Sequence, residues 1–419
     1  MSNILKVYAF VALFVIGWWT LAFKQKSSND PSPTLISLAE VSNQEPKPSV
    51  APPLINVKRE QLKLALAGDL ALMAQLIVEW DINAQILQQT GLSSVKRLPA
   101  HELLRSQILK RHLFTTAPDE LNIIKQNHRL KSLTDDAGNT ITLDKTFQRY
   151  LPQTYISASF LLALVPTDEI VALPRCLREH EQLYPKDLTA QIPLDIDRYN
   201  AEKLFQAQPE IAFVAHYSHP ATIQALLNQG VILYTMKNPT SIEDISAELL
   251  QMGHIINRPF EAELLKIFID AAMLALDNHL LTLTRPLITT HTPIPQLLFL
   301  NHHQNFSIPT PRTISGQLLA RMGDLDISLA YVETHQQSQE WMMPIDKEQI
   351  INLDPDYLII AAEATQALNK EIRQNMGLKQ LKAVRNNHLY FVDESIQHSP
   401  TQYIVLAYFD LIQCMAGLQ

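Results

Sequence analysis

Two stretches of the sequence share a pattern that strongly limits how the chain folds. Residues 200–215 read NAEKLFQAQPEIAFVA, and residues 346–361 read DKEQIINLDPDYLIIA. In both, a glutamate lies seven residues before a proline, an acidic residue follows the proline, and an apolar run comes next. Proline ends a helix because it lacks an N–H group and its ring clashes with the preceding turn. Two such helix–proline–strand units in the same order predict two lobes of similar build.

Short apolar runs alternate with predicted helices from about residue 140 onward. Helices are expected at 200–207 and 220–229. The predicted strands are 147–152, 169–173, 211–216 and 231–236 in the first series, and 296–301, 357–361 and 389–393 in the second. Continuous apolar strands separated by helices are typical of parallel sheets covered on both faces. We therefore expect an α/β fold with two parallel-sheet lobes, at 140–257 and 285–419.

A long helical stretch separates the two series of strands. Asn257 is expected to cap its start, and Pro259 falls just inside it, where a missing N–H is tolerated. Residues 260–283 continue with apolar spacing and no breaker, which makes a rod of roughly 36 Å. We expect this connecting helix, 258–284, to end before Pro286 and to join the lobes rigidly.

The first 26 residues have the features of a membrane segment. Residues 7–23 carry no charged side chain and would span roughly 25 Å as a helix. The run ends in the letters TLAF, a poor fit to the small residues before a signal-peptide cleavage site. An uncleaved N-terminal transmembrane helix at 1–26 is therefore preferred over a cleaved signal peptide.

Two further segments precede the lobes. Six prolines between residues 27 and 57 predict an extended linker. Residues 58–139 are expected to form a helical extension, because apolar residues recur at helical spacing between 62 and 77. In a bacterium, this order places the lobes in the periplasm, anchored to the inner membrane.

Composition argues against several classes of function. The formal net charge of −8, with no Lys/Arg run, argues against nucleic-acid binding. The closest glycines, Gly316 and Gly323, are seven residues apart, so GxGxxG, P-loop and GxSxG motifs do not occur. Two cysteines cannot build a zinc knuckle. Because no nucleophile–base pair can be recognised either, we do not expect an enzyme.

The two lobes and the helix between them resemble a known family. The resemblance rests on PEIAFVAHYSHPATIQALLNQGVILYTMKNPTSIEDISAELLQMGHIINR in the first lobe, and on INLDPDYLIIAAEA and LKQLKAVRNNHLYFVDESIQHSP in the second. Over residues 140–419 the chain is similar to the helical-backbone substrate-binding proteins of bacterial ABC importers, the periplasmic receptors for cobalamin, ferric siderophores and haem. The resemblance implies an interlobe cleft, a ligand held by loops at the carboxyl ends of the strands, an inner-membrane ABC permease as partner, and no covalent cofactor.

The sequence departs from this family where the permease docks. The family commonly has one exposed glutamate on each lobe for this contact, and the equivalent positions here are Pro220 and Arg312. The docking acids are thus absent, and a membrane tether would supply part of the lost affinity.

Ten candidate ligand contacts lie in the loops after the predicted strands. They are Thr154, Tyr155, Arg175, His216, Tyr217 and His219 in the first lobe, and His302, Gln304, Glu363 and His398 in the second. Because imidazole and phenolate ligate haem iron, His216 and Tyr217 are candidate ligands to the metal of a bound chelate. A ferric siderophore already saturates its iron, so its receptor would instead offer Arg175 and the Tyr217 ring.

Each candidate has a structural alternative. His216 would bond to a neighbouring backbone carbonyl, His398 would cap the terminal helix, and Arg175 would pair with Glu179. His302 and His303 are adjacent, so at most one of them faces a given ligand in an extended segment.

Three functions follow from these residues. The leading one is a membrane-tethered receptor of an ABC importer that captures haem, a ferric siderophore or cobalamin. The alternative is an envelope interaction protein that uses the same fold without transport. A receptor for free zinc or manganese ranks lower, because the loops contain no clear His/Glu/Asp set.

Overall fold

The computed structural model describes residues 57–73, 75–77, 80, 132–180, 183–192, 194–196, 201–330, 340–363 and 365–415. All of them belong to one compact unit, which runs from residue 51 to residue 419. The membrane segment expected at 1–26 and all but the last residue of the linker lie outside the described residues. None of the helices that the structure does describe combines the length and apolar character needed to cross a bilayer.

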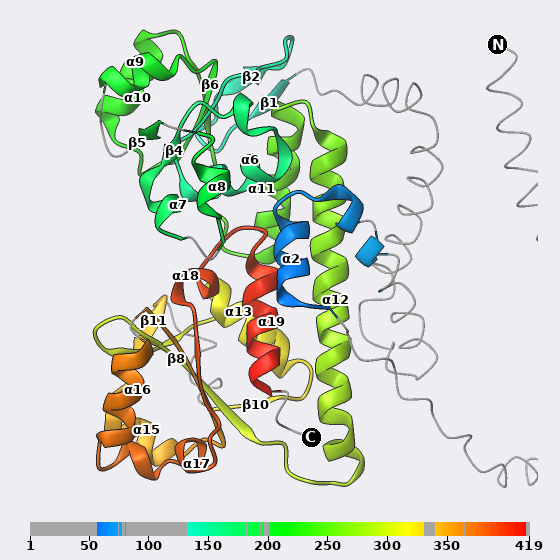
Figure 1. The fold of residues 1–419 in the computed structure, drawn as a ribbon, viewed down its shortest axis with the longest axis vertical. Coiled ribbons are helices and arrows are strands. Elements are labelled where there is room, and N and C mark those ends of the chain that lie inside the picture. The colour runs from blue at the N-terminus through cyan, green and yellow to red at the C-terminus, as the bar shows by residue number, and fades with distance from the viewer. Residues whose placement is uncertain are drawn as a thin grey trace, which may run out of the picture. The chain divides into compact units, whose positions relative to one another are not determined.

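The first lobe contains a parallel sheet with β6 (Ile211–Val214) at its centre (Figure 1). β3 (Tyr150–Pro152) and β7 (Ile232–Thr235) flank β6, and β4 (Leu173–Pro174) pairs with β5 (Asp195–Ile196) nearby. The helices are α6 (Tyr155–Leu164), α7 (Arg175–Glu179), α8 (Lys186–Thr189), α9 (Ala201–Ala207), α10 (Pro220–Asn228) and α11 (Ile242–Ile255). These bounds confirm the helices and most of the strands expected in this part of the chain.

The second lobe contains a mixed sheet in the order β11-β9-β8-β12-β13, with β10 beside the start of β8. Its strands are β8 (Gln296–His302), β9 (Phe306–Pro309), β10 (Ser328–Leu329), β11 (Met342–Pro344), β12 (Tyr357–Ala362) and β13 (Leu389–Val392). Its helices are α13 (Ile314–Gly323), α15 (Lys347–Leu353), α16 (Thr365–Gln374), α17 (Lys382–Arg385), α18 (Glu394–Gln397) and α19 (Ile404–Met415). β8, β12 and β13 run parallel, as expected, but β9 is antiparallel to both of its neighbours.

The repeated sequence pattern forms the same structure twice. α9 leads into β6, and α15 leads into β12, with a proline at each junction. The residues directly before these prolines, Gln208 and Asp354, both have left-handed backbones, with φ of 45° and 40°. The chain therefore makes the same reversal at both junctions, which confirms that the two lobes share a building unit.

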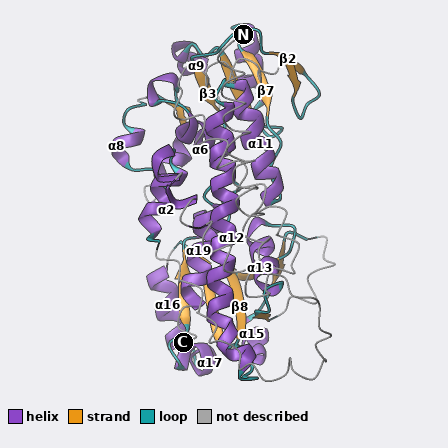
Figure 2. Cartoon of the chain, turned by 90° about the vertical axis from the view of Figure 1, so that its right-hand side faces the viewer, coloured by secondary structure: helices purple, strands orange, loops and turns teal. Residues whose placement is uncertain are grey.

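The connecting helix is α12 (Pro259–Thr289), which is continuous over 31 residues. It lies against α11 of the first lobe and α19 of the second (Figure 2). The expected end before Pro286 is wrong, because the helix continues through this proline. Pro286 is exposed and lies in the last turn of α12. The hydroxyls of Thr289 and Thr290 bond to carbonyls of the last turns.

One large apolar core includes residues of both lobes and of α12. The sheet of the second lobe separates this core from a smaller apolar cluster, and the side chains of β8 alternate between the two. Leu297 and Phe299 belong to the large core, and Leu298 and Leu300 belong to the cluster on the other face of the sheet. This alternation follows from the two-residue period of a strand.

Several elements of the second half differ from expectation. The sequence did not predict α16, β9 or β11. The terminal helix is α19, which begins at Ile404, and α18 precedes it as a separate short helix.

Residues 81–131 of the extension expected at 58–139 lie outside the described residues, and the part that is described is not helical throughout. α2 (Arg59–Leu66) is helical, but β1 (Ser132–Thr134) and β2 (Thr140–Thr142) form an antiparallel hairpin. Gly138 has a φ of 84° in the turn of this hairpin, a conformation that glycine adopts without strain.

Candidate functional site

The ten candidate residues lie at or beyond the carboxyl ends of strands. Thr154 and Tyr155 follow β3, Arg175 follows β4, and His216, Tyr217 and His219 follow β6. In the second lobe, His302 ends β8, Gln304 lies in the next turn, Glu363 follows β12, and His398 comes after β13 and α18. Open α/β sheets bind ligands at these ends of their strands. Ligand contact by any of the ten stays a prediction.

His216 is held by a carboxylate. Its Nε2 lies 2.6 Å from Oδ2 of Asp136, in the β1–β2 turn. A carboxylate only accepts hydrogen bonds, so the Nε2–H of His216 donates and the lone pair of the neutral ring is at Nδ1. The turn itself is fixed, because the Asp136 N–H donates to the Thr235 carbonyl over 3.0 Å. The partner of His216 is thus a side-chain carboxylate rather than the expected backbone carbonyl.

His398 is held by a hydroxyl. Its Nδ1 lies 3.1 Å from Oγ of Ser315, and Ser315 donates its one hydrogen to the Gln397 carbonyl over 2.7 Å. Nδ1 of His398 must therefore be the donor, which leaves the lone pair at Nε2. Burial lowers the pKa of His398 to about 4, so the ring stays neutral at physiological pH. The side chain of His398 thus bonds to α13, while its backbone forms the C-cap of α18; it does not cap the terminal helix α19, which begins at Ile404.

Three other candidates have local structural contacts. The Thr154 hydroxyl caps α6 by accepting from the Ser157 N–H over 3.1 Å. Nδ1 of His219 caps α10 by accepting from the Ala221 N–H over 3.2 Å. Arg175 pairs with Glu179 at 3.7 Å, as its structural alternative predicts.

The two candidate tyrosines differ in exposure. Tyr155 packs edge-on against Tyr184, which packs in the same way against Tyr403 of the second lobe. Tyr217 is 70% exposed. Tyr155 therefore belongs to a packed aromatic row between the lobes, and Tyr217 presents its ring to solvent.

One carboxylate follows each of β12 and β13, namely Glu363 and Glu394. Burial, and then the nearby charge of Glu363, raise the pKa of Glu394, whereas His303 lowers it. No group of three or more His, Cys, Asp or Glu side chains within the described ranges is arranged to hold a metal ion. A site for free zinc or manganese, the function given the lowest rank from the sequence, is not preformed among these residues.

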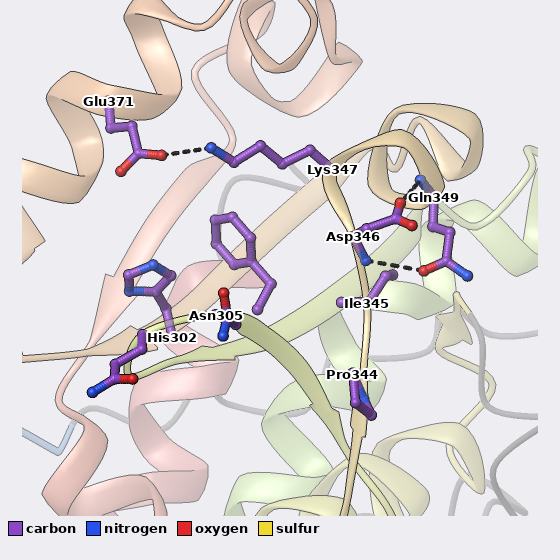
Figure 3. Close-up of a pocket in the computed structure, with 10 residues that line it drawn as sticks. His302, Asn305, Pro344, Ile345, Asp346, Lys347, Gln349 and Glu371 are labelled. Atoms are coloured by element: carbon purple, nitrogen blue, oxygen red, sulfur yellow. Dashed lines mark hydrogen bonds and ion pairs between the residues drawn. The ribbon is translucent and has the colours of Figure 1, made fainter.

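A pocket of about 590 Å³ lies at the end of the β8–β9 hairpin (Figure 3). His302 and Gln304 line it, as do Asn305 and Glu371, and all of its ten lining residues come from the second lobe. The Nζ of Lys347 lies 2.7 Å from Oε1 of Glu371 at this pocket. The structure therefore brings two of the candidates together here and places the others outside this pocket.

Sequence reasoning missed Asp136 and Ser315, the two residues that orient the histidines. Asp136 is 80 positions from His216, and Ser315 is 83 from His398. The sequence DDAGN predicts the turn that contains Asp136, but no local pattern predicts which side chain bonds to this turn.

The fold and these loops define a two-lobed α/β binding protein with one connecting helix. The chain belongs to the periplasmic binding protein family, whose sequence profile matches residues 155–396. This membership implies a periplasmic location, and proteins of this family work with the permeases of ABC transporters.

Solved structures share the fold. A possible iron-binding periplasmic protein of Staphylococcus epidermidis is 19% identical, with a TM-score of 0.53, over 65% of this chain and 100% of its own. A periplasmic haem-binding protein of Roseiflexus is 17% identical, with a TM-score of 0.51, over 65% and 99%. A molybdate-bound protein of Haemophilus influenzae is 12% identical, with a TM-score of 0.51, over 69% and 92%. No curated protein matches the sequence.

Proposed function

We propose that the protein is a periplasmic receptor for a metal chelate whose metal accepts an axial ligand, with haem as the first candidate and cobalamin as the second. The observation that carries this proposal is a pair of oriented imidazoles, one in each lobe. His216 and His398 each donate one ring N–H to a fixed oxygen, and in the neutral imidazole the other ring nitrogen then has a lone pair.

This arrangement suits a metal ligand. Metal-binding histidines usually donate their second ring nitrogen to a carboxylate or another oxygen, which fixes the tautomer and the ring orientation. Haem iron takes axial ligands of this kind. A ferric siderophore has no open position and would depend on groups such as Arg175, which is paired with Glu179. The iron- and haem-binding proteins among the structures of similar fold support the same class of ligand.

Titration of the full-length protein with haemin tests the proposal. We expect a shifted and sharpened Soret band, and His216→Ala or His398→Ala should change this spectrum and weaken binding by about 10- to 100-fold. His291→Asn is the matched control, because His291 is an exposed histidine with a φ of 56°, which asparagine tolerates. If both variants bind haemin with the affinity and the spectrum of the wild type, His216 and His398 are not the metal ligands. A response to ferric siderophore alone would replace haem as the ligand.

We also propose that residues 1–26 anchor this receptor to the inner membrane beside an ABC permease. Neither Pro220 nor Arg312 supplies an acidic docking group, so the tether would raise the local concentration of receptor. Alkaline extraction of membranes tests the anchor: the full-length chain should stay in the membrane pellet, and a chain without residues 1–26 should not. Release of both chains would contradict it.

A further inference from the structure

We infer that the described residues between 57 and 80 (57–73, 75–77 and 80), here called the brace, lock the two lobes together and hold the loop at 398–403 in place. The brace lies before the segment that matches the family, which begins at residue 155. Its buried apolar residues, from Leu62 to Trp80, nevertheless belong to the same apolar core as α12 and both lobes.

The brace is attached to the second lobe by an ion pair and to α12 by packing. The guanidinium of Arg59 donates to both carboxylate oxygens of Asp410 on α19, over 2.7 and 2.9 Å. Leu62 and Leu66 are fully buried. Trp80 stacks on Phe268 of α12, with ring centroids 5.5 Å apart.

The brace touches the first lobe where α2 ends. Gly68 has a φ of 105°, and a Cβ added there would lie 2.4 Å from the carbonyl oxygen of Ala163 on α6. The close approach of these two backbones therefore requires glycine, both for its conformation and for its lack of a side chain.

Gln402 joins the three parts. It is fully buried in the loop between α18 and α19, and its side-chain amide donates to the Leu66 carbonyl of the brace over 3.3 Å. The same amide donates to the Ser159 carbonyl of α6 over 2.8 Å. One side chain of the second lobe thus bonds to the brace and to the first lobe.

These contacts give the brace a role in positioning. The loop at 398–403 begins at His398 and contains Gln402, so a shift of the brace moves the segment that contains this imidazole. The effect on ligand binding rests on the proposed function, whereas the lock itself does not.

Native-state hydrogen exchange of the full-length protein, without ligand, tests the lock. Gly68→Ala forces α2 away from α6, and the amides of the 398–403 loop and of α6 should exchange about 10- to 100-fold faster. Gly230→Ala is the matched control: Gly230 also follows a helix C-cap with positive φ, at 73°, but a Cβ there would meet nothing within 4 Å. The increase in amide exchange caused by Gly230→Ala should be confined to residues near the end of α10.

Arg59→Met gives a second variant that leaves the backbone unstrained. It should raise exchange in the same segments by a smaller factor, about 3- to 10-fold. Unchanged exchange at 398–403 in both brace variants, or an equal change in Gly230→Ala, would overturn the inference. A parallel haemin titration separates the two proposals, because exchange reports on the lock even if haemin does not bind.

Discussion

The attachment of α12 to the second lobe can be tested at one buried ion pair. Asp277 of α12 is 1% exposed and accepts two hydrogen bonds from Arg321 of α13, over 2.9 and 2.6 Å. The hydroxyl of Tyr408 on α19 donates to the same carboxylate over 2.8 Å. The carboxylate therefore joins three helices at a place with little water.

Asp277→Asn keeps the shape of the side chain but removes its charge. Breaking a buried ion pair typically costs 3–5 kcal/mol, and the partial exposure of Arg321 puts the expected loss near the lower end, at about 3 kcal/mol. Lys266→Met is the control on the same helix: it removes the more exposed pair with Asp270, which is expected to contribute at most about 1 kcal/mol.

Urea unfolding of the two full-length variants and the wild type measures these free energies by linear extrapolation. The order wild type, Lys266→Met, Asp277→Asn is expected, with the last clearly the least stable. Equal stability of the two variants would refute the argument that burial makes the Asp277 pair important for joining α12 to the second lobe.

Two predictions concern pH. The pKa of His398 is lowered to about 4 in the folded protein. As the pH falls, the imidazole of the unfolded chain is therefore protonated before that of the folded protein. The free energy of unfolding should fall by about 3 kcal/mol as the pH drops from about 6.5 to 4. His398→Gln should flatten this part of the curve in urea titrations, and an unchanged slope would contradict the assignment. The pKa of Glu248 is raised to about 7, chiefly by burial, so the folded state holds its proton more tightly and loses stability as the pH rises from about 4.5 to 7. Glu248→Gln should therefore stabilise the protein at pH 8 more than at pH 5, by up to about 3 kcal/mol in the same assay, and an equal effect at both pH values would argue against a buried charge.

The sequence predicted those elements that depend on strong local signals. Pro209 and Pro355 each end a helix before a buried apolar strand, and this pattern is readable without any knowledge of tertiary contacts. The central part of α12 could also be predicted from the sequence, because it contains no helix-breaking residue before Pro286. The end of α12 was not predicted correctly, because a proline normally ends or kinks a helix and α12 continues through Pro286.

The missed elements have weak local signals. α16 buries Leu368 and Ile372 only, and apart from Ala367 the rest of its sequence is polar. β9 and β11 are each four residues or shorter, and they form a sheet edge through pairing with each other and with β8. Such short strands are specified by their partners more than by their own residues.

The sequence likewise predicted some residues of the candidate site and not others. Its histidines could be named because they follow apolar strands, and the carboxyl ends of parallel strands are where ligands bind. The orienting partners could not, since Asp136 and Ser315 meet His216 and His398 only in the folded chain. The pairing of both lobes with residues 57–80 is likewise invisible in the sequence, because it depends on buried contacts such as those of Gln402.

The absorption spectrum of the full-length protein, purified from its own host without added ligand, tests the central claim most directly. A Soret band, with sharp visible bands on reduction, is the predicted result for a tetrapyrrole bound through imidazole nitrogen. A colourless protein that takes up neither haemin, cobalamin nor a ferric siderophore afterwards would contradict the account.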